Sequence, residues 1–351
     1  MNDRFDAVSV MSGLRGHTHP WFFCVFLGVI FMKRSLLSLA LVVAGVAHAQ
    51  VKWDLPTGYA ANTFQTQNNQ QFAKEVDELT GGKLKITLHP GGSLYKANEI
   101  KRAVQTGQVP SAEFILSGAA NENPLFGVDS VPFLATSYAD SWRLYQAAKP
   151  AQEKLLASQG MKLLFSVAWP GQSLYSNKPI QAPADFVGTK MRAYNPASTR
   201  IAQLLKAQPV TIQLSELGQA LATNTVNNFL TSSASGVESK LYEQVKYFYT
   251  VNAWLPRNAT VVNQKAFDSL DKATQDAVLK AAAAAEKRGW ETSERLDKEY
   301  LKELAAKGMV IAEPSAALKA EFATIGSTMT DEWVKVAGAD GKAIVDAYRK
   351  R

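Results

Sequence analysis

The sequence predicts an α/β fold made of two lobes, with mainly parallel sheets. Short apolar segments typical of strands alternate with amphipathic segments typical of helices through most of the chain. The alternation extends over ~300 residues, near the length at which a single hydrophobic core stops growing. No flexible linker rich in Pro, Gly or Ser separates the halves. We therefore expect two lobes joined by strands that cross between them and form a hinge.

The first half of this alternation begins with a strand over 51–55 and a helix over 64–79. Thr80-Gly81-Gly82 ends the helix, because Gly readily adopts the left-handed cap conformation. Leu84, Ile86 and Leu88 alternate with polar residues, which indicates a strand. The next predicted elements are a helix over 97–106, a strand over 113–116, a helix over 141–158 and a buried strand over 161–167.

The second half repeats the alternation with shorter elements. Its predicted strands and helices are strands at 187–193, 210–213, 226–230, 245–251 and 259–263, and helices at 197–206 and 215–222. A long helical region follows over 267–307, and cap signals near Asp271 divide it. We expect this long connecting helix to span both lobes and to bend as they close.

The N-terminal segment has the pattern of a targeting sequence. Met32-Lys33-Arg34 is positively charged, an apolar run follows over 36–46, and Ala47-His48-Ala49 fits a small-x-small cleavage site. The run is shorter than the ~20 apolar residues that a spanning helix needs. We expect 32–49 to be a signal peptide that directs the protein to the periplasm, and 1–31 to be an upstream extension. A longer signal or an N-terminal anchor is the alternative.

Composition argues against catalysis and against nucleic-acid binding. Residues 50–351 contain no Cys and a single His, His89, which excludes thiol chemistry and Cys/His metal sites. The common nucleotide-binding, zinc-protease and serine-hydrolase motifs are absent from the chain. Without 1–49 the formal net charge falls from +7 to +5, and it is spread along helix faces such as 280–307. We expect no enzymatic activity, metal, cofactor or nucleic-acid partner.

A series of segments carries a family resemblance. It includes 80–86, Ala103-Val104-Gln105-Thr106-Gly107, Val131-Pro132-Phe133-Leu134 and 160–164. The most specific block runs from Asn177-Lys178-Pro179-Ile180 to Met191-Arg192, and Ser215-Glu216-Leu217-Gly218 follows it. In this order, over nearly all of 50–310, the segments resemble solute-binding proteins of tripartite ATP-independent periplasmic (TRAP) transporters, dicarboxylate-binding type.

The resemblance implies a two-lobed periplasmic binding protein fold that closes on a ligand. It also implies delivery of that ligand to the small and large membrane subunits of an ion-gradient-driven permease. We expect lobe I to comprise 50–169 with 257–296, and lobe II to comprise 170–256 with 297–351. We further expect a monomer.

The resemblance assigns Arg192 to a ligand carboxylate. Arg192 ends a predicted strand, and ligands of open α/β sheets lie beyond the carboxyl ends of strands. A guanidinium also matches a carboxylate with two parallel donors. The alternative is an ion pair with a surface acid. Many relatives carry a second Arg near the position of Gln172, and its absence here argues against a dicarboxylate ligand.

Two further departures from the family pattern concern the lining and the hinge. Asn227-Asn228 stands where the family has Asp-Gly, and Val109-Pro110-Ser111 lacks the acidic residue that normally follows Gly107.

The remaining candidates follow predicted strand ends. They are Trp169, Gln172, Tyr194, Asn195, Phe229 and Thr231, together with Tyr59, Asn62, Phe64, Leu116 and Ser117 from the first lobe. Other interpretations stay open: Trp169 and Phe229 as core packing, Asn62 or Thr63 as a helix cap, and Glu216 as a first-turn cap. One Arg among several aromatic residues favours a monocarboxylate with an aromatic or apolar body. A receptor for a hydroxylated or sugar acid, or one linked to a sensor, is the alternative.

Overall fold

The computed structural model describes residues 50–350, so the predicted extension and signal peptide in 1–49 lie outside the described residues. The described chain begins with a β–α–β unit. Strand β1 (Val51–Pro56) pairs in parallel with β2 (Leu84–His89), and α2 (Phe64–Thr80) connects them. Thr63 is the N-cap of α2, since its hydroxyl accepts a hydrogen bond from the Thr66 amide, and Gly81 ends the helix at φ 60°.

A second sheet has β10 (Arg257–Asn263) between β3 (Ser111–Ile115) and β4 (Met161–Ala168). Both pairings are antiparallel, so the expectation of mainly parallel sheets is wrong here. The reason is topological, because β4 carries the chain out of this part of the molecule and β10 brings it back. We call these two sheets and the helices packed on them lobe I, which includes α3 (Ile100–Gln105) and α4 (Tyr138–Ser158).

Lobe II is built on a mixed six-stranded sheet in the order β11-β9-β5-β8-β6-β7. Its strands are β5 (Ser173–Ser176), β6 (Lys190–Ala193), β7 (Gln208–Thr211), β8 (Asn228–Thr231), β9 (Tyr247–Tyr249) and β11 (Val310–Ala312). Strand β6 runs parallel to β7 and β8, whereas β5 runs antiparallel to β8 and β9. The helices between these strands are α5 (Pro196–Leu204), α6 (Leu214–Ala222) and α7 (Ser233–Glu238).

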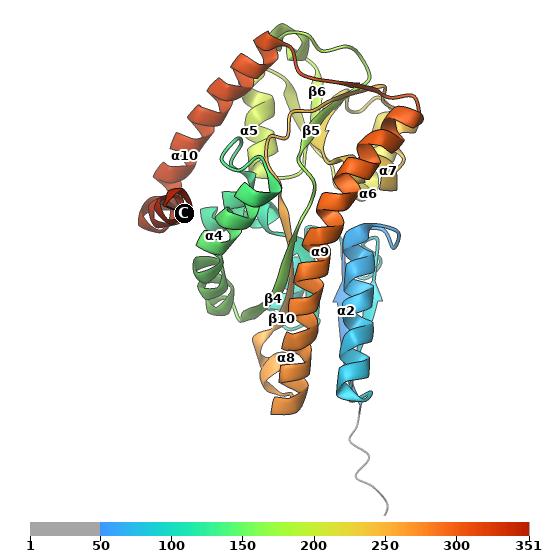
Figure 1. Ribbon diagram of the computed structural model, residues 1–351, viewed down its shortest axis with the longest axis vertical. Helices are drawn as coiled ribbons and strands as arrows, with labels where there is room; N and C mark the ends of the chain where they lie inside the picture. Colours follow the sequence, from blue (N-terminus) through green and yellow to red (C-terminus); the bar gives the residue numbers. More distant parts are fainter. Residues whose placement is uncertain (1–49, 351) are drawn as a thin grey trace, which may run out of the picture. The chain divides into compact units, whose positions relative to one another are not determined.

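Two chain segments cross between the lobes side by side. One leads from β4 into β5, and the other leads from β9 back into β10 (Figure 1). Backbone hydrogen bonds join them, from the Trp169 amide to the Pro256 carbonyl and from the Gln172 amide to the Trp254 carbonyl, both at 2.8 Å. The crossing is therefore a paired hinge without a flexible tether.

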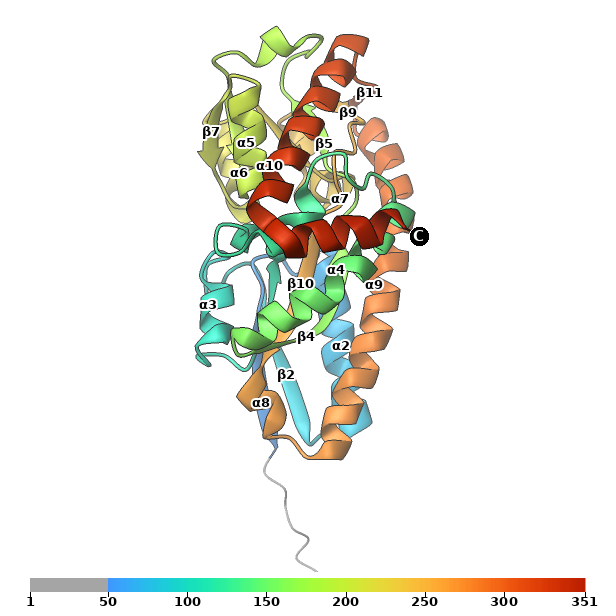
Figure 2. The ribbon, with the colours of Figure 1, turned by 90° about the vertical axis from the view of Figure 1, so that its left-hand side faces the viewer.

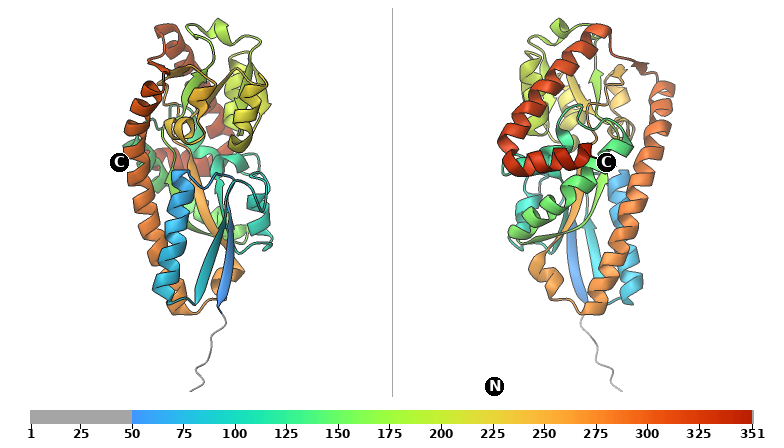
Figure 3. Two further views of the ribbon diagram at one scale, coloured as in Figure 1. Left: turned by 90° about the vertical axis from the view of Figure 1, so that its right-hand side faces the viewer. Right: turned by 60° about the vertical axis from the view of Figure 1, so that its left-hand side comes forward.

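A long helix, α9 (Lys272–Ala306), connects the two lobes. Its 35 residues span about 52 Å at 1.5 Å per residue. It packs against α2 and β4 in lobe I and against α7 in lobe II, and Figure 3 shows α2 and α9 side by side. Asp271 caps the N-terminus of α9, and the short helix α8 (Gln264–Asp268) precedes it. This agrees with the prediction that the helical region divides near Asp271.

The C-terminal helix α10 (Ala316–Arg349) also contacts both lobes. Its first half contributes Leu318 and Phe322 to the core of lobe II, whereas Ile344 and Tyr348 pack with residues of α4. The two halves meet at Gly338, which has φ 59° and ψ −142°, and Figure 2 shows the change of direction. The predicted bounds, 50–169 with 257–296 for lobe I and 170–256 with 297–351 for lobe II, stay a prediction about which residues move together when the lobes close.

The predicted elements have observed counterparts with ends shifted by a few residues. Elements without a sequence-based prediction are β5, α7, β11 and α10. Short 3-10 turns complete the fold at Leu116–Ala119, Pro124–Ser130, Pro183–Phe186 and Leu241–Glu243.

Candidate functional site

A cavity of about 150 Å³ lies where side chains of both lobes meet. Half of the predicted site residues line it, namely Tyr59, Trp169, Gln172, Arg192, Tyr194 and Thr231. The rest of the lining is Gly58, Ala97, Asn98, Lys101, Phe114, Ile115, Gly118, Ala119, Glu122, Gln213, Leu214, Ser235 and Pro256. A cavity of this volume holds about one benzene-sized ring. The site is therefore suited to a small ligand.

Arg192 is a buried cation without an acidic partner among residues 50–350. It is 4% exposed on β6, and its Nε donates a hydrogen bond to the Ile212 carbonyl at 2.9 Å. Its guanidinium carbon lies 4.8 Å from the ring centroid of Tyr194. Burial lowers the pKa of Arg192 to about 10. Arg192 forms no ion pair with a surface acid in the described chain, which was the alternative interpretation of this residue. The terminal nitrogens of its guanidinium can donate hydrogen bonds to a carboxylate.

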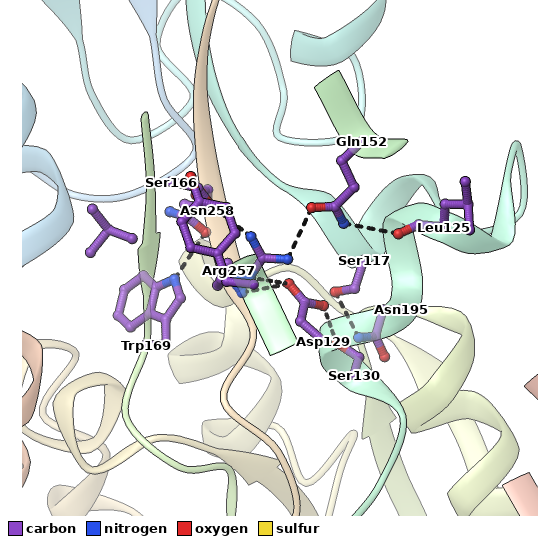
Figure 4. Close-up of polar contacts among 12 residues, drawn as sticks. Ser117, Leu125, Asp129, Ser130, Gln152, Ser166, Trp169, Asn195, Arg257 and Asn258 are labelled. Atoms are coloured by element: carbon purple, nitrogen blue, oxygen red, sulfur yellow. Dashed lines mark hydrogen bonds and ion pairs between the residues drawn. The ribbon is translucent and has the colours of Figure 1, made fainter. Parts of the chain in front are cut away.

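Tyr59 and Trp169 form an aromatic wall of the cavity, with ring centroids 5.0 Å apart. Both donate hydrogen bonds to the side-chain oxygen of Asn258, Trp169 at 2.9 Å (Figure 4) and Tyr59 at 3.2 Å. The Asn258 amide nitrogen in turn donates to Glu113 at 2.8 Å. Burial raises the pKa of Glu113, a carboxyl that also accepts from Thr57. These buried polar groups hold the orientation of the aromatic wall.

Gln172 and Tyr194 form the polar side of the cavity next to Arg192. The Tyr194 hydroxyl donates to Gln172 Oε1 at 3.1 Å and accepts from the Trp254 indole at 3.3 Å. Gln172 therefore supplies a neutral amide on this side of the cavity.

The other predicted site residues lie outside the lining. Phe229 is fully buried and stacks on Tyr175, while Phe64 and Leu116 belong to the cores of lobe I. Asn62 donates to the backbone carbonyl of Glu238 across the lobes, and Asn195 donates to the hydroxyl of Ser117 at 2.9 Å. Asn195 and Ser117 thus join the lobes beside the cavity (Figure 4).

A buried ion pair braces the hinge next to the cavity. Arg257 begins β10, and its backbone amide donates to Asp129 Oδ2 at 2.9 Å while its Nε lies 3.5 Å from the same oxygen. Its terminal nitrogens donate to Ser166 and Gln152 (Figure 4). Burial raises the pKa of Asp129 to about 6, and the neighbouring Arg257 opposes that shift.

Several lining residues were missed by sequence reasoning. Gln213 and Ser235 follow the ends of β7 and β8, so the strand-end rule applied to every strand would have included them. Gly118 and Ala119 were not missed, because the sequence already suggested that 116–119 faces the cleft. Lys101 and Glu122 come from unrelated segments, and their spacing gives no signal.

The described residues contain no group of three or more His, Cys, Asp or Glu side chains placed to hold a metal ion. Within 50–350, none of the helices combines the length and the apolar character that a bilayer crossing demands.

Two hinged lobes surround a small cavity with a buried cation that has no acidic partner within 50–350, which is the arrangement of a binding protein for a small anionic solute. The chain belongs to the bacterial extracellular solute-binding proteins, family 7 (DctP), whose sequence profile matches residues 57–335. This confirms the resemblance to TRAP solute receptors. Members of the family are extracytoplasmic transport receptors rather than enzymes, and TRAP receptors bind small carboxylates and work with TRAP permeases.

Three solved structures are closely similar. DctP6 of Bordetella pertussis, an extracytoplasmic solute receptor binding pyroglutamic acid, is 52% identical, with TM-score 0.84 over 86% of this chain and 100% of that one. A TRAP solute-binding protein from a marine metagenome, specific for pyroglutamate, is 43% identical, with TM-score 0.85 over 86% and 99%. DctP7 of B. pertussis, also a pyroglutamic acid receptor, is 40% identical, with TM-score 0.84 over 85% and 99%.

Proposed function

We propose that this protein is the receptor for pyroglutamate, or for a monocarboxylate of the same size and shape, and that it delivers the ligand to a TRAP permease. The observation that carries the proposal is Arg192, a buried guanidinium with no acidic partner in the described chain. One pKa unit corresponds to about 1.4 kcal/mol, so the fall from 12.5 to about 10 implies a burial cost on the order of 3 kcal/mol. A bound carboxylate offsets that cost.

The size of the cavity supports a compact ligand. Its volume of about 150 Å³ is well below the ~300 Å³ at which ligand pockets usually begin. Pyroglutamate is a single lactam ring that carries one carboxylate. It matches both the volume of the cavity and Arg192, the lining cation that has no acidic partner in the described part of the chain. Sugar acids are larger and carry many hydroxyls that need partners, so we rank them second.

The chemistry of the walls supports a flat ring with an amide. Tyr59, Trp169 and Phe114 offer aromatic surface, whereas Gln172, Thr231 and Ser235 offer hydrogen-bonding groups at other points of the lining. A lactam has one N–H donor and one carbonyl acceptor to satisfy there. The similarity to three pyroglutamate receptors supports the same choice.

Isothermal titration of the purified protein tests the proposal. Pyroglutamate should bind and raise the melting temperature, and glucuronate and gulonate should bind more weakly. Arg192→Ala should abolish binding, and Arg192→Lys should weaken it by roughly 100-fold because the paired donors are lost. Arg200→Ala, which removes an exposed Arg bonded to Glu332, is the matched control and should bind normally. Undiminished binding by Arg192→Ala would refute the assigned role.

Export is part of the proposal and has its own test. The mature N-terminus from a periplasmic extract should be Gln50, following cleavage after Ala49. An N-terminus at Met32 or earlier would argue for an anchor or for another leader.

A further inference from the structure

The charged groups that line the cavity leave one net positive charge. Two cations, Arg192 and Lys101, and one carboxylate, Glu122, line it. The remaining titratable lining residues are Tyr59 and Tyr194. Burial raises the pKa of both phenols well above their usual value, so both are neutral at physiological pH.

We propose that the ion pair between Lys101 and Glu122 makes this receptor select monocarboxylates over dicarboxylates, by cancelling the second cation of the cavity. The inference rests on the proposed function, in which Arg192 binds the ligand carboxylate. It replaces the simpler expectation that a second cation is missing. The structure has a second cation, which comes from α3 instead of the position of Gln172.

The environment of Lys101 fixes its ammonium in place. The Lys101 side chain is 8% exposed, and its Nζ bonds to Glu122 Oε2. It also donates to Gln105 Oε1 at 3.4 Å and lies 5.3 Å from the ring centroid of Phe126. Because Gln105 and Phe126 remain when Glu122 is neutralised, the ammonium stays beside the cavity.

Glu122 acts against a second ligand carboxylate in two ways. It occupies the Nζ of Lys101, and its own negative charge repels another anion in the same lining. The Glu122 side chain is 52% exposed, whereas its partner Lys101 is nearly buried. Discrimination therefore comes from a repulsive group against the wrong ligand as well as from attraction of the right one.

Titration of Glu122→Gln with pyroglutamate, succinate and glutarate tests the inference. The measured quantity is the ratio of dicarboxylate affinity to pyroglutamate affinity. This ratio should rise at least roughly tenfold over the wild type, the scale expected for one extra unit charge in a partly buried site. An unchanged ratio in a folded Glu122→Gln protein overturns the inference.

Two further variants keep the test decisive if Glu122→Gln folds poorly. Lys101→Met/Glu122→Gln restores a single net positive charge, and its ratio should return to within a few-fold of the wild type. Lys101→Met alone leaves the cavity lining with no net charge and should weaken pyroglutamate binding. An unchanged affinity would contradict the inference that the lining carries one net positive charge. Glu78→Gln, which breaks an exposed Lys74–Glu78 pair outside the cavity, is the control and should leave the ratio unchanged.

The two proposals fail in different ways. If the wild type does not bind pyroglutamate, the proposed ligand is wrong, whatever the variants do. If it binds pyroglutamate and the dicarboxylate ratio is the same in all variants, only the role of Lys101 and Glu122 is wrong. Succinate and glutarate are titrated against every protein, so the selectivity is measured in both cases.

Discussion

The indole nitrogen of Trp169 donates a hydrogen bond of 2.9 Å to the side-chain oxygen of Asn258. Asn258 is not part of the cavity lining, yet it also accepts from Tyr59 and donates to Glu113. A single buried amide therefore orients two aromatic side chains that line the cavity. The shape of the candidate site depends on polar groups behind its wall.

Asn258→Ala should loosen that wall. Trp169, Glu113 and the partly buried Tyr59 lose a partner, and an unsatisfied buried group costs about 1–3 kcal/mol. We expect the free energy of unfolding to fall by at least ~2 kcal/mol and pyroglutamate affinity to fall at least roughly tenfold, because Tyr59 and Trp169 gain freedom. Urea unfolding and calorimetric titration measure the two effects.

The control for this variant lies on the same strand. Asn263 is also a buried amide of β10, and it donates to the Val104 carbonyl at 2.9 Å, outside the cavity lining. Asn263→Ala should lower stability and leave ligand affinity intact. Equal affinity losses in the two variants would show that the Asn258 effect is only structural.

The site residues that were predictable are those whose local context fixes their position. Arg192 and Tyr194 end or follow β6, and Trp169 follows β4, so the strand-end rule brings them to one place. The same rule misplaced Phe229, whose fully buried ring stacks on Tyr175 in the core of lobe II. Thr231, at the end of the same strand, lines the cavity.

Contacts between distant segments were not predictable. The pairing of Lys101 with Glu122 and the placement of Asn258 behind Trp169 depend on tertiary packing, which the spacing of residues does not encode. Strands β5 and β11, four and three residues long, had no sequence-based prediction. In α10, Gly326, Gly338 and Gly341 weaken the helical signal.

Glu238 makes the stability of the folded protein sensitive to pH. Burial raises the pKa of this carboxyl to about 8, although the Phe64 amide and the Tyr300 hydroxyl donate to it. Between the ordinary value of 4.5 and about 8, the folded protein keeps a proton that the unfolded chain releases. The contribution to stability is therefore complete below that window and is lost as the pH rises through it.

Glu238→Gln should remove this dependence. Between about pH 5 and about pH 9, the free energy of unfolding of the wild type should fall more than that of the variant, by on the order of 4 kcal/mol. Urea unfolding of the ligand-free proteins at a series of pH values measures the difference. Parallel curves for the two proteins would contradict the assignment of the proton to Glu238.

Gly289 lets the long helix α9 approach β4 closely. A Cβ atom at this position would lie 2.8 Å from Val167 Cγ1 and nearer still to its Cγ2, and 2.9 Å from Asn68 Nδ2. Gly289→Ala should therefore reduce the free energy of unfolding by about 1–3 kcal/mol through overpacking, despite the better helix propensity of Ala. Adding Val167→Ala makes room and should recover part of the loss, a non-additive effect that urea unfolding can measure.

The hydrogen bond between Asn195 and Ser117 should contribute to affinity without touching the ligand. It joins the N-cap of α5 in lobe II to lobe I at 2.9 Å, so we expect it to form only when the lobes are closed around the cavity. Ser117→Ala should weaken ligand binding by about 0.5–1.5 kcal/mol, mainly through faster dissociation. Ser117 is the residue to change, because Asn195 also caps α5.

The control is Ser111→Ala, which removes a buried hydroxyl that bonds within lobe I, to the Asp54 carbonyl. This variant should lower the stability of the protein, while the rate of ligand dissociation measured by stopped flow stays the same. Equal dissociation rates for Ser117→Ala and the wild type would show that this bond does not hold the closed state.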